Sequence, residues 1–227
     1  MSEIDWEAKI AETLHKDNED HEEHDEATDD GIFHASWMGY CKRNILLSKQ
    51  GIEKKTAEDL GRFMTGTLIH EFMEYEVEEF LPDHVEMEDP IPELEQGPLT
   101  FVGTADAVDH ENEIIYDFKS RGGWYKFEPP IQRHLDQLQI YMQAFGYDRA
   151  KVVYINKKNM EVKTWPEESG EFIEKDSSRY YELVAKAIDV YEYLQEHGGV
   201  ESMEELNAYE RPCNNFFCGD EDLKFES

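Results

Sequence analysis

The sequence has few basic residues for its acid content. It carries 22 lysines and arginines against 53 aspartates and glutamates, a formal net charge of −31 over 227 residues. This shortage argues against a protein that binds nucleic acid through a broad basic surface. Two hypotheses would still allow such binding. In the first, the protein works in a salt-rich cytoplasm, where phosphate contacts are screened in any case. In the second, its few cations gather at one groove.

Cysteines and long apolar runs are also scarce. The three cysteines are Cys41, Cys213 and Cys218, and the N-terminal sequence MSEIDWEAKI lacks the features of a secretion signal. We therefore expect no disulfide framework, and the cysteines are interpreted as buried thiols or metal ligands. No apolar run approaches the length of a membrane span, so a cytoplasmic protein without a membrane partner is expected.

Composition divides the chain into three segments. Residues 1–30 are predicted to be a flexible acidic segment with a short amphipathic helix over 1–16. Nine acids and two histidines fall within residues 17–30; a solvated loop is the preferred interpretation and a metal-binding tract the rarer one. Residues 31–199 are expected to form the folded domain. Residues 200–227 would be a tail that packs with the Cys41 region.

Apolar periodicity predicts the order of elements within the domain. From Thr56 to Leu81 apolar residues recur at three- and four-residue steps, which indicates a helix that Thr56 caps and Pro82 ends. The remaining expected elements are a short strand at 84–88, strands 99–109 and 114–120 around a turn at 110–113, a loop at 121–130, a helix at 131–145, strands 150–157 and 160–165, and a helix at 171–196. This αβββαβ order predicts an α/β fold with a central mixed sheet flanked by helices.

The predicted hairpin brings two acids together. With a four-residue turn over 110–113, Asp109 faces Ile114 and Asp106 faces Asp117, at Cβ separations of roughly 4.5–5.5 Å. Lys119 shares the face of Asp117, because the two residues are two apart in a strand. Either a divalent cation such as Mg²⁺ or Mn²⁺ bridges the carboxylates, or both aspartates point to solvent and the lysine offsets their charge.

At these residues the chain resembles the PD-(D/E)XK nuclease superfamily. The likeness is to its RecB-like branch, which includes the CRISPR-associated RecB-like exonucleases. The matching motifs, in chain order, are GTLIHE with His70, GTAD with Asp106, DFKS with Asp117 and Lys119, and QLQIY with Gln137 and Tyr141. The resemblance covers residues 60–155 and extends more loosely to the flanks. It implies a restriction-endonuclease-like core.

The resemblance also implies roles for these residues. His70, Asp106, Asp117 and the backbone carbonyl of Phe118 would bind the metal, and an imidazole ligand favours Mn²⁺ over Mg²⁺. Lys119 would position or activate the attacking water and counter charge on the scissile phosphate.

Further residues around this site carry weaker expectations. Gln137 and Tyr141, neighbours on one helix face, would support Lys119 or contact the DNA backbone. Glu74, one turn after His70, is a less favoured ligand in a sequence so rich in glutamate. Arg121 and Lys126 stand among the aromatic residues of the loop 121–128. These aromatics either stack on single-stranded DNA or pack into the core.

Many relatives of this branch hold a [4Fe–4S] cluster on four cysteines, one before the nuclease core and three after it. Cys41, Cys213 and Cys218 match the placement but fall one short, and the C-x4-C spacing departs from the usual pattern. Asp220, Asp222, His34 or an outside group could complete the set. A zinc site and a degenerate remnant without metal remain open.

The function implied by these features is a metal-dependent deoxyribonuclease. We expect an exonuclease on single strands or DNA ends, in recombination, repair or CRISPR adaptation, with a protein partner in such a complex. The alternative is a non-catalytic or partner-dependent member of the fold that binds DNA or protein. The sequence does not distinguish an RNA substrate from a DNA substrate.

Overall fold

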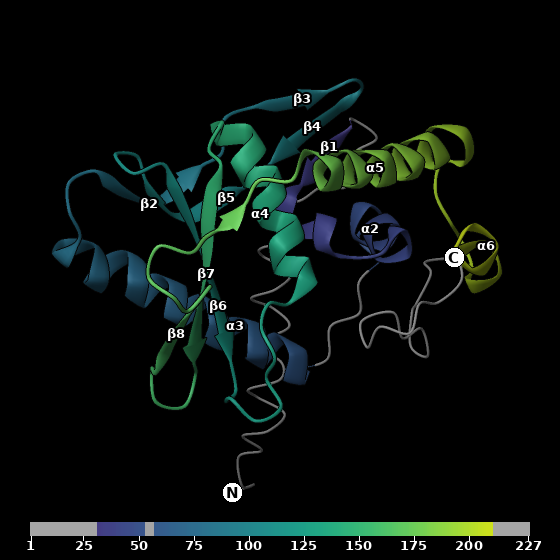
Figure 1. The fold of residues 1–227 in the computed structure, drawn as a ribbon. Helices are drawn as coiled ribbons and strands as arrows, with labels where there is room; N and C mark the ends of the chain where they lie inside the picture. Colours follow the sequence, from purple (N-terminus) through teal and green to yellow (C-terminus); the bar gives the residue numbers. More distant parts are fainter. Residues whose placement is uncertain (1–30, 53–56, 211–227) are drawn as a thin grey trace, which may run out of the picture.

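A mixed sheet from the middle of the chain forms the centre of the fold (Figure 1). The computed structural model describes residues 31–52 and 57–210. Among these residues a six-stranded sheet has the order β2-β5-β6-β7-β8, with β9 also paired to β7. The strands are β2 Val85–Pro90, β5 Thr104–Asp109, β6 Ile114–Arg121, β7 Arg149–Asn156, β8 Val162–Trp165 and β9 Ile173–Glu174. Strands β6 and β7 run parallel and the other pairs antiparallel, which confirms the predicted mixed α/β fold.

A second, smaller sheet joins segments from the start of the domain and from the region before β5. It consists of β1 Ile32–His34, β3 Leu94–Gln96 and β4 Leu99–Val102, in the order β1-β4-β3. The prediction of one strand over 99–109 was wrong. The chain breaks at Gly103, whose φ of +157° is open mainly to glycine, and β4 and β5 enter different sheets.

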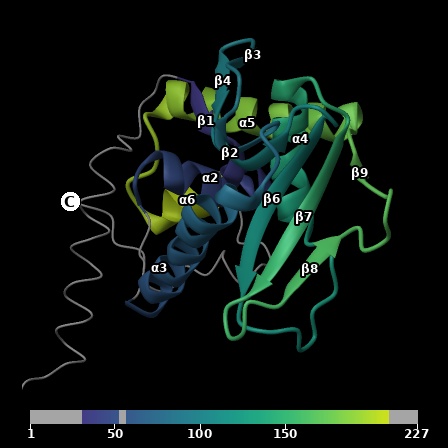
Figure 2. The ribbon, with the colours of Figure 1, turned by 90° about the vertical axis from the view of Figure 1, so that its left-hand side faces the viewer.

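Helices cover both faces of the large sheet (Figures 1 and 2). They are α2 Lys42–Lys49, α3 Ala57–Phe72, α4 Gln132–Phe145, α5 Ser177–His197 and α6 Met203–Tyr209, with 3-10 turns η1 Ala35–Gly39 and η3 Glu78–Phe80 and a π-helical turn η2 Met73–Val77. The last long helix begins at Ser177, later than the predicted 171, because Ile173–Glu174 pair with β7 and Asp176 caps the helix by accepting from the amides of Ser178 and Arg179.

Two apolar clusters hold these layers together. The larger one joins α4, α5, α2 and η1 to one face of the sheet and contains Ile115 and Val152. The smaller one joins Ile69 of α3 to the opposite face, through Phe118 and Ile155. Alternate residues of β6 and β7 therefore enter different clusters, as expected for a sheet buried on both faces.

Helix α3 exposes many of the apolar side chains whose spacing predicted it. The helix itself is confirmed, and Leu60 and Ile69 are buried. Phe63, Leu68 and Phe72, however, are 57%, 58% and 46% exposed. Met64, Tyr75 and Phe80 are also exposed. The period predicted the helix correctly, but most of its apolar side chains are exposed in the part of the chain that the structure describes. The capping residue Thr56 lies outside the described residues.

The start of the tail packs against α2. Leu206 of α6 is fully buried, and Arg43 Nη1 donates a hydrogen bond of 2.8 Å to the carbonyl of Glu210. The predicted segments at 1–30 and beyond residue 210 lie outside the described residues. Within the part that is described, no helix is both long and apolar enough to cross a membrane.

One ion pair fixes α4 against α5. Arg179 Nε and Nη2 donate to the two carboxylate oxygens of Asp136, each at 2.8 Å, and Gln132 also donates to Asp136. The Asp136 side chain is 4% exposed, so it depends on these donors for compensation.

We expect Arg179→Met to lower the free energy of unfolding by roughly 2 kcal/mol, because it leaves the Asp136 carboxylate buried without its charged partner. The expected loss of unfolding free energy is smaller than the cost of breaking a fully buried ion pair, because a third of the Arg179 side chain is exposed. Urea denaturation followed by circular dichroism measures the change. Lys175→Met, which removes a pair with the exposed Asp148, is the control and should have little effect. Equal effects of the two substitutions would contradict this prediction.

Candidate active site

The site begins where the β5–β6 hairpin opens. The pairs Asp109–Ile114, Val108–Ile115 and Ala107–Tyr116 confirm the predicted register. The ladder then stops, and the amide of Phe118 donates to the side chain of Asp106 instead of to a main-chain carbonyl. The two strands therefore separate at the position where Asp106 and Asp117 were predicted to meet. The separation leaves room for side chains from neighbouring elements.

Asp117 is a buried carboxylate with unequal oxygens. Its Oδ1 accepts a 2.6 Å hydrogen bond from Lys119 Nζ, whereas its buried Oδ2 has no partner among the described residues. The residue is 0% exposed, so the interpretation that the aspartates point to solvent was wrong. Burial raises the pKa of Asp117 to about 6, although the Lys119 charge opposes this.

Lys119 remains charged in this setting. Burial alone would favour the neutral amine, but the charges of Asp117 and Asp106 outweigh it and raise the pKa of Lys119 above its ordinary value. Its side chain is 23% exposed. The Lys119 ammonium therefore lies beside the carboxylates of Asp117 and Asp106.

Helix α3 brings His70 to the same place. His70 Nδ1 lies 3.3 Å from Asp106 Oδ1, and its ring packs edge-on against Phe118. The hydrogen bond to Asp106 raises the pKa of His70 against the opposing effect of burial. The predicted residues His70, Asp106, Asp117 and Lys119 are thus gathered by the fold.

Sequence reasoning missed Glu88 of β2. Its Oε1 lies 4.0 Å from His70 Nδ1, and burial followed by the Asp106 charge raises its pKa. Glu88 has φ +49°, a left-handed conformation that is costly for a glutamate. Nothing in the acidic stretch around it distinguishes Glu88 from its neighbours. The one hint was its place in an expected strand beside the hairpin.

The left-handed turn at Glu88 also reverses the alternation of β2. Its neighbours Glu86 and Asp89 both reach His110, whose Nε2 lies 3.6 Å and 3.1 Å from their carboxylates. Glu88 alone turns to His70 and Asp106. One backbone conformation thus divides the acids of β2 between two places.

The donor set suits a divalent cation. One ligand atom each from His70, Glu88 and Asp106 lie within 4.8 Å of one another, and the unpartnered Oδ2 of Asp117 is a buried acceptor that a cation would satisfy. Carboxylate oxygens with one imidazole nitrogen suit Mn²⁺ and related ions. The role of the Phe118 carbonyl as a ligand, and Asp117 as a direct ligand, stay predictions.

Gln137 and Tyr141 lie next to the site on α4. Gln137 Nε2 donates to the Tyr141 hydroxyl at 2.7 Å, and that hydroxyl donates to the carbonyl of Thr104 at 2.8 Å. These hydrogen bonds fix the start of β5, two residues before Asp106, and do not involve Lys119. Their expected support of Lys119 or of DNA stays a prediction.

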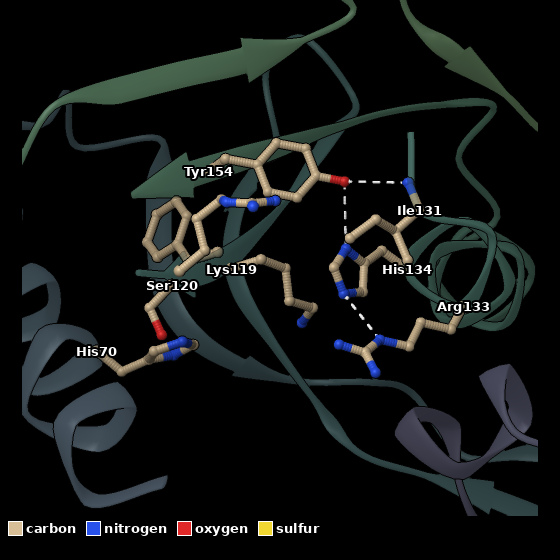
Figure 3. A pocket seen from close by; sticks show the side chains of 9 residues that line it. His70, Lys119, Ser120, Ile131, Arg133, His134 and Tyr154 are labelled. Atoms are coloured by element: carbon tan, nitrogen blue, oxygen red, sulfur yellow. Dashed lines mark hydrogen bonds between the residues drawn. The ribbon is translucent and has the colours of Figure 1, made fainter. Parts of the chain in front are cut away.

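A cavity of about 290 Å³ opens beside Lys119. Figure 3 shows it from close by, with His70 on one side and Arg133 and His134 on the other. The loop 121–131 forms part of its rim. Here Arg121 lies 3.8 Å over the ring of Phe127. Trp124 and Phe127 pack against the core, as one of the two expectations had it. Tyr125 is exposed, and its stacking on single-stranded DNA stays a prediction.

The described cysteine lies at the start of α2. Cys41 occupies the N-cap position without a side-chain capping bond, and its Sγ donates to Asn44 Oδ1 at 3.4 Å. Cys213 and Cys218 fall outside the described residues. His34, one candidate fourth ligand, packs against Trp37.

The fold and this acidic site with its lysine define a nuclease. The model of the PD-(D/E)XK nuclease superfamily matches residues 9–218, and the chain therefore belongs to that superfamily. No curated protein matches the sequence.

Several solved structures are similar to this chain. LHK-Exo in complex with dAMP has a TM-score of 0.51 and 14% identity, covering 82% of this chain and 96% of that one; the protein is described as an alkaline exonuclease from Laribacter hongkongensis. The structure of SSO0001 has a TM-score of 0.48 and 18% identity, covering 82% of this chain and 86% of that one. A phage related exonuclease from Haemophilus somnus 129PT has a TM-score of 0.40 and 13% identity, covering 74% and 96%.

Glu88→Gln tests whether β2 supplies a metal ligand. We expect at least about tenfold weaker Mn²⁺ binding by isothermal titration calorimetry, because one carboxylate oxygen is replaced by a weaker amide donor. The melting temperature without metal should not fall, since a carboxylate facing Asp106 is removed. Glu95→Gln changes an exposed glutamate of β3 and serves as the control. An unchanged Mn²⁺ affinity in Glu88→Gln would remove Glu88 from the site.

Proposed function

We propose that the protein is a divalent-metal-dependent deoxyribonuclease, an exonuclease acting on single-stranded DNA or DNA ends. The observation that carries the proposal is the Asp117 carboxylate, buried with one oxygen held by Lys119 and the other without a partner among the described residues. A buried carboxylate oxygen without a hydrogen-bond donor is costly, and such an arrangement is typical of a site that binds a cation. Family membership supports nuclease chemistry, and the exonuclease preference extends it.

Each residue has a distinct task in this proposal. His70, Asp106 and Asp117, with Glu88 and the Phe118 carbonyl, hold the ion. A bound Mn²⁺ or Mg²⁺ supplies a Lewis acid for the phosphoryl oxygens and makes water more acidic. Lys119, fixed by Asp117, orients the attacking water and counters the charge that develops on the scissile phosphate. Gln137 and Tyr141 position β5, and so position Asp106.

Reaction stoichiometry is that of hydrolysis. Water oxygen forms a bond to phosphorus and gives up one proton, the phosphorus–oxygen bond to the departing nucleotide breaks, and the departing oxygen takes up one proton. Without a cation the acids of the site repel the DNA backbone. The activity is therefore proposed to depend on metal throughout.

The proposed pathway rests on the resemblance to the RecB-like branch, and the proposed setting rests on the net charge. We propose a role in recombination, repair or CRISPR adaptation, in a salt-rich cytoplasm that suits the charge of −31. The second candidate is a partner-dependent or non-catalytic protein of the same fold that binds DNA or protein. The exposed apolar residues of α3, among them Phe63 and Leu68, favour a partner.

The nuclease proposal is tested on end-labelled single- and double-stranded DNA with Mn²⁺, Mg²⁺ or EDTA, at low and molar KCl. We expect metal-dependent cutting that falls at least about 10²-fold in Asp117→Ala and in Lys119→Ala, with a product ladder typical of exonuclease action. Higher activity in molar KCl supports the salt-rich setting.

The same assay separates the alternatives. No cutting under any condition, with Mn²⁺ binding intact, would favour the partner-dependent candidate. Cutting that survives both substitutions would place the active site elsewhere.

A metal centre at the cysteines is proposed separately. Glu210 contacts α2 through Lys42, whose Nζ lies 3.3 Å from Glu210 Oε2, and through Arg43. Cys213 and Cys218 follow three and eight residues later in the sequence. This supports a site shared by Cys41, Cys213 and Cys218, filled by a [4Fe–4S] cluster with an outside fourth ligand or by zinc.

Anaerobic purification tests this centre. A cluster gives brown protein that contains iron, and Cys41→Ser should lose both the colour and the iron. Zinc by elemental analysis in colourless protein would favour the zinc alternative. Protein with neither metal would leave the three residues as thiols.

A further inference from the structure

The cavity beside Lys119 is cationic in a protein that is otherwise acidic. Lys119, Arg121 and Arg133 all line it, and no carboxylate does among the described residues. Of the two hypotheses for the charge of the chain, a cluster of cations at one place therefore has direct geometric support. In Figure 3 Lys119 lies between His70 on one side and Arg133 on the other.

A chain of hydrogen bonds orients the Arg133 guanidinium. Arg133 Nε donates to His134 Nε2 at 3.2 Å. Because Nε2 accepts, the ring hydrogen of His134 belongs on Nδ1, which lies 3.2 Å from the hydroxyl of Tyr154. The amide of Ile131 donates to the same hydroxyl at 3.4 Å. The arginine is thus connected to the backbone at the start of α4 and to β7.

His134 keeps one protonation state. Burial, and then the charges of Lys119 and Arg133, lower the pKa of His134 to about 2. The ring is therefore neutral at ordinary pH, and its Nε2 remains an acceptor for Arg133. A charged ring in this place would repel the guanidinium instead.

The backbone at Arg133 is fixed as well. Gly39 of η1 packs so closely on α4 that a Cβ there would lie 2.5 Å from both Cβ and the carbonyl oxygen of Arg133. The Arg133 guanidinium also lies 5.9 Å from the ring of Tyr40. Such fixation at both ends of a long side chain reduces the entropy lost when it binds a ligand.

We propose that Arg133 binds the phosphate next to the scissile phosphate on the substrate strand, and that His134 is the positioning residue that orients it. This rests on the proposed nuclease function. With Nε directed to His134, the terminal nitrogens Nη1 and Nη2 form the edge of the guanidinium that suits two phosphoryl oxygens. Lys119 already serves the scissile phosphate, and Arg133 lies on the far side of Lys119 from His70.

A cycle of protein and DNA substitutions tests the contact. Fluorescence anisotropy measures binding of the full-length protein to a labelled 20-nucleotide single strand with Ca²⁺, and cleavage is followed with Mn²⁺. In a second series of strands, one linkage at a time is a neutral methylphosphonate. We expect one linkage beside the cut to weaken binding of the wild type roughly tenfold, the effect of one bidentate contact. In Arg133→Gln that linkage should have no further effect.

Further variants separate positioning from folding. Arg133→Gln should raise KM about tenfold with kcat within about threefold, and should reduce the salt dependence of binding by about 0.7 in log–log slope. His134→Phe, which removes the acceptor, should reproduce most of this. His134→Gln, which supplies an acceptor, should restore binding. Arg149→Gln, about 17 Å along β7 from Tyr154, removes an equal charge and should match the wild type.

Each outcome decides the proposal. The same methylphosphonate penalty in Arg133→Gln and in the wild type would overturn the phosphate contact, and equal defects in His134→Gln and His134→Phe would overturn the positioning role. A wild type that binds with an Arg133-dependent penalty but never cuts would retain this inference and overturn hydrolysis. A wild type that neither binds nor cuts would overturn both. Thermal unfolding of every variant by circular dichroism identifies any loss that comes from misfolding.

Discussion

The hydrogen bond from the Phe118 amide to the Asp106 side chain is the interaction on which the site depends. A main-chain carbonyl would have continued the ladder and kept β5 against β6. The carboxylate satisfies the amide and lets the strands part, so His70 and Glu88 reach the opening from a helix and an edge strand. The same bond anchors Asp106 while its other oxygen faces His70. A local exchange of one acceptor thus opens the hairpin where His70, Glu88 and Asp106 meet.

Sequence predicted the parts of the site that obey local rules. The tight turn set the register of the hairpin, and Asp109 explains why: its carboxylate accepts from the amide and the side chain of Asn112, both at 2.9 Å. Glu88 escaped prediction because its role arises from a backbone angle. The break at Gly103 escaped because two strands in separate sheets have the same pattern as one. The exposure of Phe63 and its neighbours escaped because apolar spacing predicts a helix but does not show which of its side chains other elements cover.

Charge is distributed unevenly in this molecule. The net charge of −31 would repel a polyanion over most of the surface, yet the cavity beside Lys119 is lined by three cations. Affinity for DNA would then come from a few well-oriented groups rather than from a diffuse field, whose contribution salt screens strongly. The neutral His134 contributes to this arrangement, because its ring accepts a hydrogen bond from Arg133 without adding a charge.

The left-handed conformation of Glu88 has a consequence for protein engineering. At φ +49° the backbone alone would prefer glycine or asparagine to glutamate, by about 1 kcal/mol. A library selected solely for heat resistance would therefore be enriched in such replacements at residue 88, and would discard the carboxylate that faces His70. Stabilised versions of this protein should be sought at other positions, because here thermostability and the acidic site make opposite demands on one residue.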